Sequence, residues 1–176
     1  MKHISLIILD IDGVLTDGKK YYGLDGIAFA KTYCDQDFTA IKRFRAVGLP
    51  VCFLSGDTRI NENMAKNRNI DFYSSKGTNK AQFVQKLCKI YNTTPLQMVY
   101  VGDDLFDIDI MKLVGYPYCP SNSCADIKKI CEPSNILKNM AGNNVVSELH
   151  EVLVRLDLID NATLQQIEEL DRLEIF

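Results

Sequence analysis

Apolar runs that end in glycine or acidic residues alternate along the chain with segments whose apolar residues recur at helical spacing. The continuous runs are typical of strands buried on both faces of a parallel sheet, and the spaced residues of amphipathic helices. The predicted strands cover residues 6–9, 51–54, 71–73, 98–101 and 116–119, with a short extended segment at 135–137. The predicted helices cover residues 37–47, 58–68, 80–91, a segment ending near 114, 125–130 and 145–156. This alternation predicts a doubly wound, Rossmann-like α/β domain with a mostly parallel sheet and right-handed crossovers.

Two further segments add to this domain. Residues 19–22 and 27–31 flank a glycine-containing turn at 23–26, which predicts a β-hairpin placed to overhang whatever follows the first strand. Residues 160–176 carry a narrow apolar stripe and predict an additional helix, docked on the same subunit or on a neighbour. We therefore expect a main domain over 1–157 and a helical tail over 158–176.

The first strand runs directly into two aspartates, Asp10 and Asp12. Ligands of doubly wound sheets collect at the carboxyl ends of the strands. Residues two apart on a strand point the same way, so these carboxylates begin close together and a cation would offset their repulsion. Gly13 permits a tight turn and close ligand approach. A calcium loop or a solvated turn is the alternative, but the EF-hand pattern requires Asp or Asn at the position of Val14. The sequence favours a metal-assisted active site.

Similar signals follow two later strands. They are Ser55, Gly56 and Asp57, and then Gly102, Asp103, Asp104 and Asp107. Lys80 stands in the first turn of a predicted helix, where its charge opposes the helix dipole. A solvated lysine costs only a few tenths of a kcal/mol there, so both a functional and a surface role stay open.

In order and spacing these residues resemble the four motifs of the haloacid dehalogenase superfamily of aspartate-nucleophile phosphatases, over about residues 4–156. The continuation Leu15-Thr16-Asp17-Gly18, the immediate hairpin, the absence of a cap insertion and the Gly-Asp-Asp run resemble the 3-deoxy-manno-octulosonate 8-phosphate phosphatases within it. Related phosphatases of nine-carbon ulosonate (KDN or N-acylneuraminate) 9-phosphates share these features.

The resemblance implies a role for each motif residue. Asp10 would be the nucleophile that forms an aspartyl phosphate, and Asp12 the general acid and base. Ser55 and Lys80 would bind the phosphoryl oxygens. Mg²⁺ would be held by the Asp10 carboxylate, the Asp12 main-chain carbonyl and Asp103. Asp107 would orient Lys80 and support the metal shell, with Gly13, Gly56 and Asp104 as further supporting residues.

The substrate is less narrowly defined. Octulosonate phosphatases commonly have arginine where this chain has Asp57, and an acid there resembles the nine-carbon enzymes. Arg59, Lys66 and Arg68 are candidates for meeting the substrate carboxylate, although they also suit a solvated helix face. The family's glycine-rich stretch before the last helix often contains arginine, but here it is Ala-Gly-Asn-Asn at 141–144. The expected substrate is an acidic 3-deoxy-2-ulosonic sugar phosphate, and lipopolysaccharide and sialic acid pathways both stay open.

The composition of the chain narrows the remaining classes of function. A net charge of −3 without a basic run gives no case for nucleic acid, and no stretch approaches the ~18 apolar residues of a membrane span. Six cysteines without a Cys-x-x-Cys pair, and only two histidines, predict no zinc site and suit a reducing compartment. We expect a cytoplasmic protein, and the resemblance implies a homotetramer in which a neighbour's hairpin and C-terminal segment close the site.

Three other functions compete with a phosphatase. A receiver-like signalling module also combines clustered acids, a hydroxyl and a lysine, but receivers place the acidic pair after the first strand and the phosphorylated aspartate after a middle one. A phosphosugar mutase of the same superfamily would need a cap to shield its intermediate from water. A catalytically silent binding module would not need every motif residue, and all of them are present.

Overall fold

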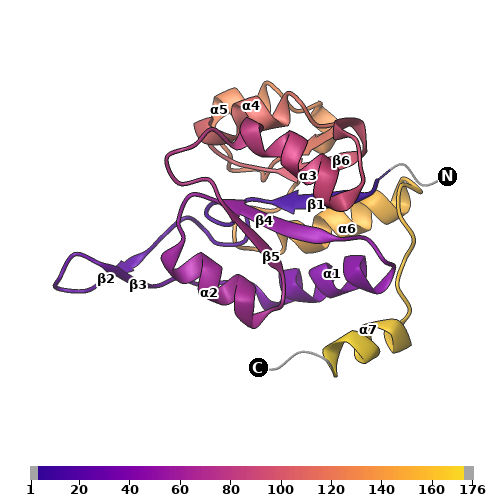
Figure 1. Cartoon of the computed structure of the whole chain (residues 1–176), viewed down its shortest axis with the longest axis horizontal. Coiled ribbons are helices and arrows are strands. Elements are labelled where there is room, and N and C mark those ends of the chain that lie inside the picture. The colour runs from indigo at the N-terminus through magenta and orange to yellow at the C-terminus, as the bar shows by residue number, and fades with distance from the viewer. Residues whose placement is uncertain (1–3, 173–176) are drawn as a thin grey trace.

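The fold is described from a computed structural model, which places residues 4–172. A five-stranded sheet has the order β5-β4-β1-β6-β7, and every neighbouring pair is parallel. Strand β1 (Leu6–Leu9) lies at the centre, between β4 (Val51–Ser55) and β6 (Met98–Val101), while β5 (Asp71–Ser74) and β7 (Tyr116–Tyr118) form the edges (Figure 1). The predicted doubly wound α/β architecture is confirmed.

Helices cover both faces of the sheet (Figure 1). One face carries α1 (Asp35–Ala46), α2 (Arg59–Asn67) and α6 (Val145–Arg155), and the other carries α3 (Val84–Tyr91), α4 (Ile108–Met111) and α5 (Ala125–Lys128). Short 3₁₀ helices cover Lys80–Phe83 (η1), Pro95–Gln97 (η2), Leu105–Asp107 (η3) and Pro133–Asn135 (η4).

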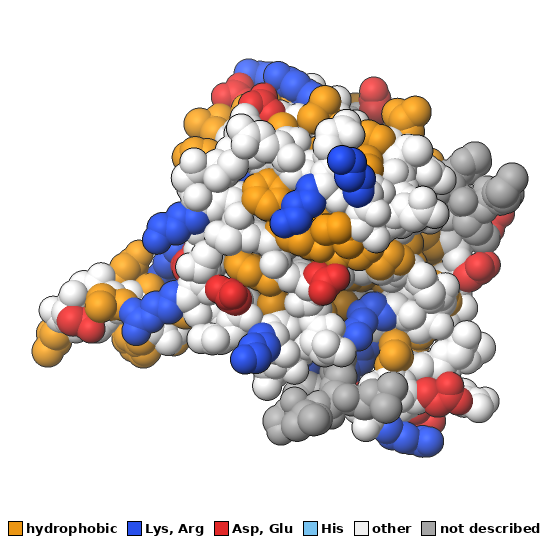
Figure 2. Space-filling model, in the orientation of Figure 1, with side chains coloured by type: hydrophobic (Ala, Val, Ile, Leu, Met, Phe, Trp, Pro, Cys, Tyr) orange, Lys and Arg blue, Asp and Glu red, His pale blue; other side chains and the backbone are white. Residues whose placement is uncertain are grey.

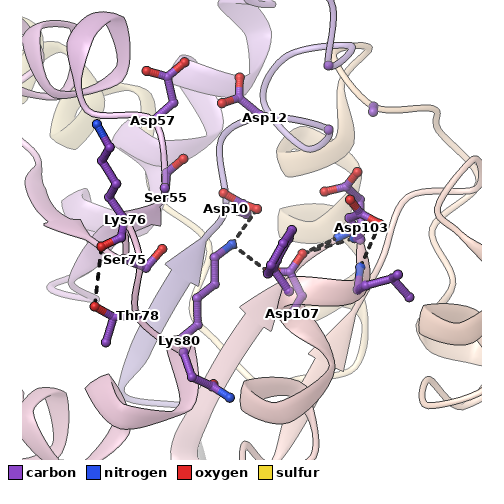
Figure 3. A pocket seen from close by; sticks show the side chains of 18 of the residues that line it. Asp10, Asp12, Ser55, Asp57, Ser75, Lys76, Thr78, Lys80, Asp103 and Asp107 are labelled. Atoms are coloured by element: carbon purple, nitrogen blue, oxygen red, sulfur yellow. Dashed lines mark hydrogen bonds and ion pairs between the residues drawn. The ribbon is translucent and has the colours of Figure 1, made fainter.

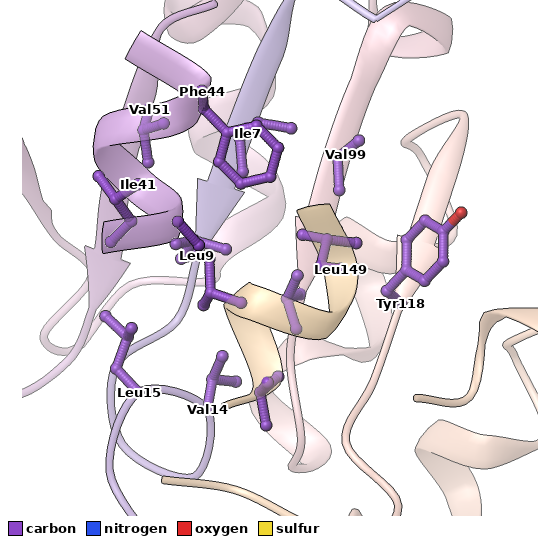
Figure 4. Close-up of a cluster of buried hydrophobic side chains, with 14 of the residues drawn as sticks. Ile7, Leu9, Val14, Leu15, Ile41, Phe44, Val51, Val99, Tyr118 and Leu149 are labelled. Carbon is purple, nitrogen blue, oxygen red and sulfur yellow. The ribbon is translucent and has the colours of Figure 1, made fainter. Parts of the chain in front are cut away.

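The side chains of β1 divide between the two layers because successive residues of a strand point to opposite faces. Ile7 and Leu9 pack with Phe44 of α1 and Leu149 of α6 (Figure 4), while Ile8 lies in the cluster on the other face. All four side chains of β1 are completely buried, so the strand that leads into Asp10 is held from both sides.

A hairpin of β2 (Tyr21–Tyr22) and β3 (Ala28–Ala30) projects from the body of the molecule, as predicted (Figure 1). It is the insertion that separates β1 from α1. Across residues 4–172 no separate cap domain is present.

Short elements differ from the sequence predictions. The first turn of the helix predicted over 80–91 is the 3₁₀ helix η1, and the segment ending near 114 is η3 followed by the short α4. Residues 135–137 contribute a single bridge, Cys119 to Ile136, instead of a strand.

The tail helix α7 (Leu164–Asp171) begins later than residue 160 because Thr163 caps it, with Gln166 completing a capping box. The predicted end of this helix, at 173–176, lies outside the described residues. Helix α7 packs on α1, where Lys42 pairs with Asp171 and Arg43 Nη2 donates to Asn161 Oδ1 at 3.0 Å. The tail therefore docks on its own subunit, one of the two expected arrangements. Within the described residues, no helix has the length and apolar character needed to cross a bilayer.

Candidate active site

The carboxyl ends of β1, β4 and β6 open into a cavity of about 1050 Å³ (Figure 3). Every predicted catalytic, phosphate-binding, metal-binding and supporting residue lines it. These are Asp10, Asp12, Gly13, Ser55, Gly56, Lys80, Asp103, Asp104 and Asp107, together with Asp57 from the predicted specificity residues. The topology explains this convergence, because parallel strands place their carboxyl ends at one edge of the sheet.

Lys80 connects the two buried carboxylates of the site (Figure 3). Its Nζ donates to Asp10 Oδ2 and to Asp107 Oδ1, both at 2.6 Å, and to the Tyr100 hydroxyl at 3.1 Å. Burial would lower the pKa of Lys80, but the neighbouring carboxylates raise it above its usual value. The lysine is therefore held as an ammonium beside Asp10, and its position at a helix start is explained by these two partners.

Asp107 is held by the loop that contains it. Its Oδ1 also accepts from the Tyr100 hydroxyl at 2.6 Å, and its Oδ2 accepts from the backbone N–H groups of Asp103 at 2.9 Å and Asp104 at 3.2 Å. A side chain on Gly102 would meet the Asp107 carboxyl at 2.6 Å, so only glycine fits there. The exposed Asp104 caps η3, accepting from Leu105 N at 2.7 Å, which is a structural role.

Asp10, Asp103 and Asp107 place carboxylate oxygens within 4.8 Å of one another, a group able to hold a metal ion. Asp103 Oδ1 is buried and has no hydrogen-bond partner among the described residues. A Cβ on Gly13 would lie 1.9 Å from Asp103 Oδ2, so glycine is required for this carboxylate to approach. An unpartnered buried oxygen on a member of this carboxylate group fits a hard divalent cation.

The electrostatics of this group support the same conclusion. Burial raises the pKa of Asp10 to about 7 although Lys80 opposes the shift. Burial, then the charges of Asp10 and Asp107, raise the pKa of Asp103 to about 8. A bound cation would relieve this crowding of like charges and favour the ionised carboxylates.

Asp12 lies on the other side of the cavity, among groups from the hairpin and α2. Lys31 Nζ lies 2.7 Å from its Oδ1 and 2.9 Å from its Oδ2, and Asn61 Nδ2 donates to Oδ2 at 3.2 Å. The Thr16 hydroxyl donates to Oδ1 at 3.4 Å. The Asp12 side chain is thereby separated from the Lys80 cluster and surrounded by donors.

Ser55 and Asp57 border Asp12. Ser55 is buried and its Oγ accepts from Asn61 Nδ2 at 3.1 Å, which leaves its own O–H available to a ligand. Asp57 Oδ2 accepts from both Lys20 and Lys31 at 2.8 Å. Burial alone would raise the pKa of Asp57, but these two lysines lower it to about 2. Asp57 faces the cavity as predicted, with its charge already paired.

Arg59 and Arg68 do not reach the cavity of their own chain. Arg59 is exposed at the start of α2, and the Arg68 guanidinium lies over the Phe38 ring of α1, 4.1 Å from its centroid. Lys66 is exposed at the end of α2.

Sequence reasoning missed five polar residues near the cavity. They are Lys20, Lys31, Asn61, Lys76 and Tyr100. The lysines on the two hairpin arms carried a usable signal, because charged residues that flank an overhanging hairpin can reach the strand ends beneath it. Tyr100 carried none, since it lies within an apolar run.

Comparisons with known proteins agree with this geometry. A family model described as haloacid dehalogenase-like hydrolase matches residues 54–148. The 3-deoxy-D-manno-octulosonate 8-phosphate phosphatase KdsC of Haemophilus influenzae is 25% identical over 156 residues, covering 88% of this chain and 85% of that protein. A KdsC of Escherichia coli strain K12 is 28% identical over 156 residues, covering 87% of this chain and 80% of that protein.

Solved structures give the same result. The cobalt-bound deoxy-D-mannose-octulosonate 8-phosphate phosphatase of H. influenzae superposes with a TM-score of 0.80 at 26% identity, covering 87% of this chain and 89% of that one. The predicted class of enzyme, a phosphoric monoester hydrolase, is confirmed. With more than half of its length matched by the family model and the four motifs gathered in one cavity, the chain belongs to the haloacid dehalogenase-like hydrolases.

Proposed function

We propose that this protein is a magnesium-dependent phosphatase that hydrolyses the phosphate monoester of an acidic 3-deoxy-2-ulosonic sugar through an aspartyl phosphate on Asp10. One observation carries the proposal. The buried Asp10 is bound to Lys80 and lies with Asp103 and Asp107 in a group of carboxylates that is able to hold a metal ion. The similarity of the chain to two KdsC proteins, which are named as 3-deoxy-D-manno-octulosonate 8-phosphate phosphatases, supports the substrate class.

The chain's own residues divide the chemistry between the two sides of the cavity. Asp10 Oδ1 accepts from Ile11 N at 2.7 Å and Oδ2 from Lys80, so the carboxylate is fixed for attack on phosphorus. Lys80 and the free hydroxyl of Ser55 supply positive charge and a donor for the phosphoryl oxygens. The phosphoryl group would sit between these residues.

Asp12 would donate a proton to the leaving sugar oxygen and then take one from the water that attacks the aspartyl phosphate. Asp10 and Asp12 are held by different groups, Lys80 for the first and Lys31 with Asn61 for the second. Two carboxylates in different environments suit two different roles.

Mg²⁺ would be held by Asp103 and Asp10, with the Asp12 main-chain carbonyl as a further ligand and Asp107 orienting the loop. When bound, the ion neutralises charge on the phosphoryl oxygens and on the crowded carboxylates. The structure of the H. influenzae relative is of a cobalt-bound form, which supports the proposal that this protein also binds a divalent cation.

Lys76 is our candidate for the group that meets the substrate carboxylate. It lines the cavity on an exposed loop, and Figure 3 shows its ammonium on the side of Ser55 and Asp57. Within residues 4–172 no carboxylate pairs with it, whereas Lys20, Lys31 and Lys80 are each bound to aspartates. The carboxylate of an acidic sugar would pair with the ammonium group of Lys76.

The test is phosphate release from a panel of an eight-carbon ulosonate 8-phosphate, nine-carbon ulosonate 9-phosphates and neutral hexose phosphates, with Mg²⁺ and with EDTA. We expect strong preference for one acidic sugar and loss of turnover in EDTA. Preference for a nine-carbon substrate would identify Asp57 as a mark of that branch. Equal, slow hydrolysis across the panel would contradict the substrate class while leaving the phosphatase chemistry intact.

The nucleophile has its own control within this experiment. Asp10→Asn keeps the size of the side chain but removes its nucleophilic oxygen, so turnover of every substrate should stop. Substantial residual activity in this variant would contradict the aspartyl phosphate.

A homotetramer is the proposed assembly. The hairpin exposes Tyr21, Tyr22, Leu24, Ile27 and Phe29. Figure 2 shows apolar side chains on the projecting arm. Contiguous exposed apolar side chains on a projection are typical of protein interfaces. A second copy of this chain is the proposed partner.

A further inference from the structure

Lys31 places a fully buried ammonium group beside the proposed acid and base. It directly follows β3, at the end of the second hairpin arm, and none of its side chain is exposed. Its Nζ contacts both carboxylate oxygens of Asp12, at 2.7 and 2.9 Å. One ammonium thus bridges the two oxygens that proton transfer would use.

The remaining partners of Lys31 also belong to the site. Its Nζ donates to Asp57 Oδ2 and to Asn61 Oδ1, both at 2.8 Å. Burying an ammonium costs several kcal/mol unless well-placed partners compensate it. Here the compensation comes from residues that line or border the cavity. The burial of Lys31 is therefore tied to the arrangement of the active site and not to the hairpin's own strands.

Asn61 extends this contact to the phosphate-binding side. Its Oδ1 faces Lys31 and the Tyr33 hydroxyl, so its Nδ2 must point the opposite way. That Nδ2 donates to Asp12 Oδ2 at 3.2 Å and to Ser55 Oγ at 3.1 Å. The orientation of one amide, fixed by Lys31, aligns the carboxylate and the hydroxyl together.

We propose that Lys31 is a positioning residue that holds Asp12 and, through Asn61, Ser55 in their reactive arrangement, which makes the hairpin part of the catalytic machinery. The inference rests on the proposed role of Asp12. A general acid must present one oxygen to the leaving group at hydrogen-bond distance, and small displacements of such groups are costly in rate. Removing the ammonium frees the Asp12 side chain to rotate and the Asn61 amide to flip.

The test compares two leaving groups in Lys31→Met. The preferred sugar phosphate needs its leaving oxygen protonated, whereas 4-nitrophenyl phosphate does not. Because kcat/KM reports steps up to the first irreversible one, it isolates this protonation from the later attack of water. We expect kcat/KM to fall by about 10²-fold for the sugar phosphate and much less for the nitrophenyl ester. Equal losses for the two substrates would overturn the inference.

Two controls separate the possible failures. Asp12→Asn should show the same selective loss, and if it does not, the proposed role of Asp12 fails before that of Lys31. Lys19→Met removes an exposed lysine of the first hairpin arm, which pairs with Asp17 at 3.0 Å and does not line the cavity. Its ratio of the two kcat/KM values should stay near that of the native protein, and a ratio as disturbed as that of Lys31→Met would contradict a specific role for Lys31.

A third variant covers loss of folding. Lys31→Arg keeps the charge but replaces a compact ammonium with a planar fork that cannot sit in the same place. It should show a smaller loss with the same preference for the sugar phosphate. A folded Lys31→Arg protein with native selectivity and rate would show that charge alone is sufficient and would overturn the positioning role.

Discussion

The lysines around the cavity differ in their carboxylate partners. Lys80 binds Asp10 and Asp107, Lys31 binds Asp12 and Asp57, and Lys76 has no such partner in the described part of the chain. A charge left unmatched at the mouth of an acidic cavity is available to an anionic ligand. In the proposed mechanism Ser55 and Lys80 bind the phosphate, which leaves Lys76 to distinguish one sugar from another.

We therefore predict that Lys76→Met changes recognition and not chemistry. A charge-assisted hydrogen bond contributes about 1.5–3 kcal/mol, so KM for the acidic sugar phosphate should rise by about tenfold or more. The value of kcat, and KM for a neutral hexose phosphate, should stay near native. Steady-state kinetics on both substrates provides the measurement, and a parallel rise in both KM values would contradict a contact with the carboxylate.

Among the individual residues of the site, those at strand ends could be predicted from the sequence, because apolar runs show where buried strands end. Asp10, Asp12, Ser55 and Asp103 follow such runs directly. Lys31 and Asn61 reach Asp12 from segments 19 and 49 residues away along the chain. Neither lies at the end of an apolar strand of the sheet, so local pattern could not connect them to the site.

Among the helices, the pair α1 and α6 contains an unusual buried group. His150 is completely buried on α6, its ring centroid lies 5.0 Å from that of Phe44, and neither ring nitrogen has a hydrogen-bond partner among the described residues. Burial, and then the charge of Arg43, lower the pKa of His150 to about 4. The neutral ring is the form that this helix pair accepts.

This packing predicts acid sensitivity. Between pH 6.5 and 4, His150 is protonated in the unfolded chain but stays neutral in the folded protein. The free energy of unfolding should therefore fall as pH falls, by at most about 1.4 kcal/mol per pH unit from this group. Urea unfolding of native protein and His150→Leu across this range gives the measurement. The difference between the two slopes isolates this residue from the carboxylates, and identical slopes would contradict the prediction.

Long elements followed their hydrophobic pattern closely, while short ones did not. Strands β1, β4 and β6 and helices α1 and α6 lie where apolar periodicity placed them. At Lys80 and at Leu105 the first turn is 3₁₀, because side chains from these turns bind across the site: Lys80 to Asp10, and Asp107 to the backbone ahead of it. Tertiary contacts determine the geometry of these turns, and local helix propensity does not predict such contacts.

The molecule as a whole has an acidic cavity beneath an apolar projection. The alternation of strands and helices predicts the fold class, a doubly wound sheet. It does not predict which strands are neighbours in that sheet. The sequence likewise does not give the surface of a neighbouring subunit that the hairpin would contact in an assembly. Its exposed apolar side chains are the feature that we expect to be covered.

We predict that native protein scatters light as a tetramer at micromolar concentration, with a mass near four times its 19.9 kDa. The double variant Leu24→Asp with Phe29→Asp should dissociate, because burying two new carboxylates in an apolar contact is costly. The control is Leu96→Asp, which changes an exposed leucine in η2, at the amino end of the sheet. A native protein that scatters as a monomer, or dissociation by the control alone, would contradict the hairpin interface.

The central place of β1 has a consequence for the order in which the enzyme becomes active. Strand β4 on one side brings Ser55, and β6 on the other leads to Asp103 and Asp107. A chain emerging from the ribosome completes the first side long before the second is made. Until β6 has inserted beside β1, such a chain holds the proposed nucleophile, acid and hydroxyl but lacks the two carboxylates that complete the proposed cation site. Phosphatase activity should therefore begin only when the two halves of the sheet have joined, and unfinished chains are expected to be silent.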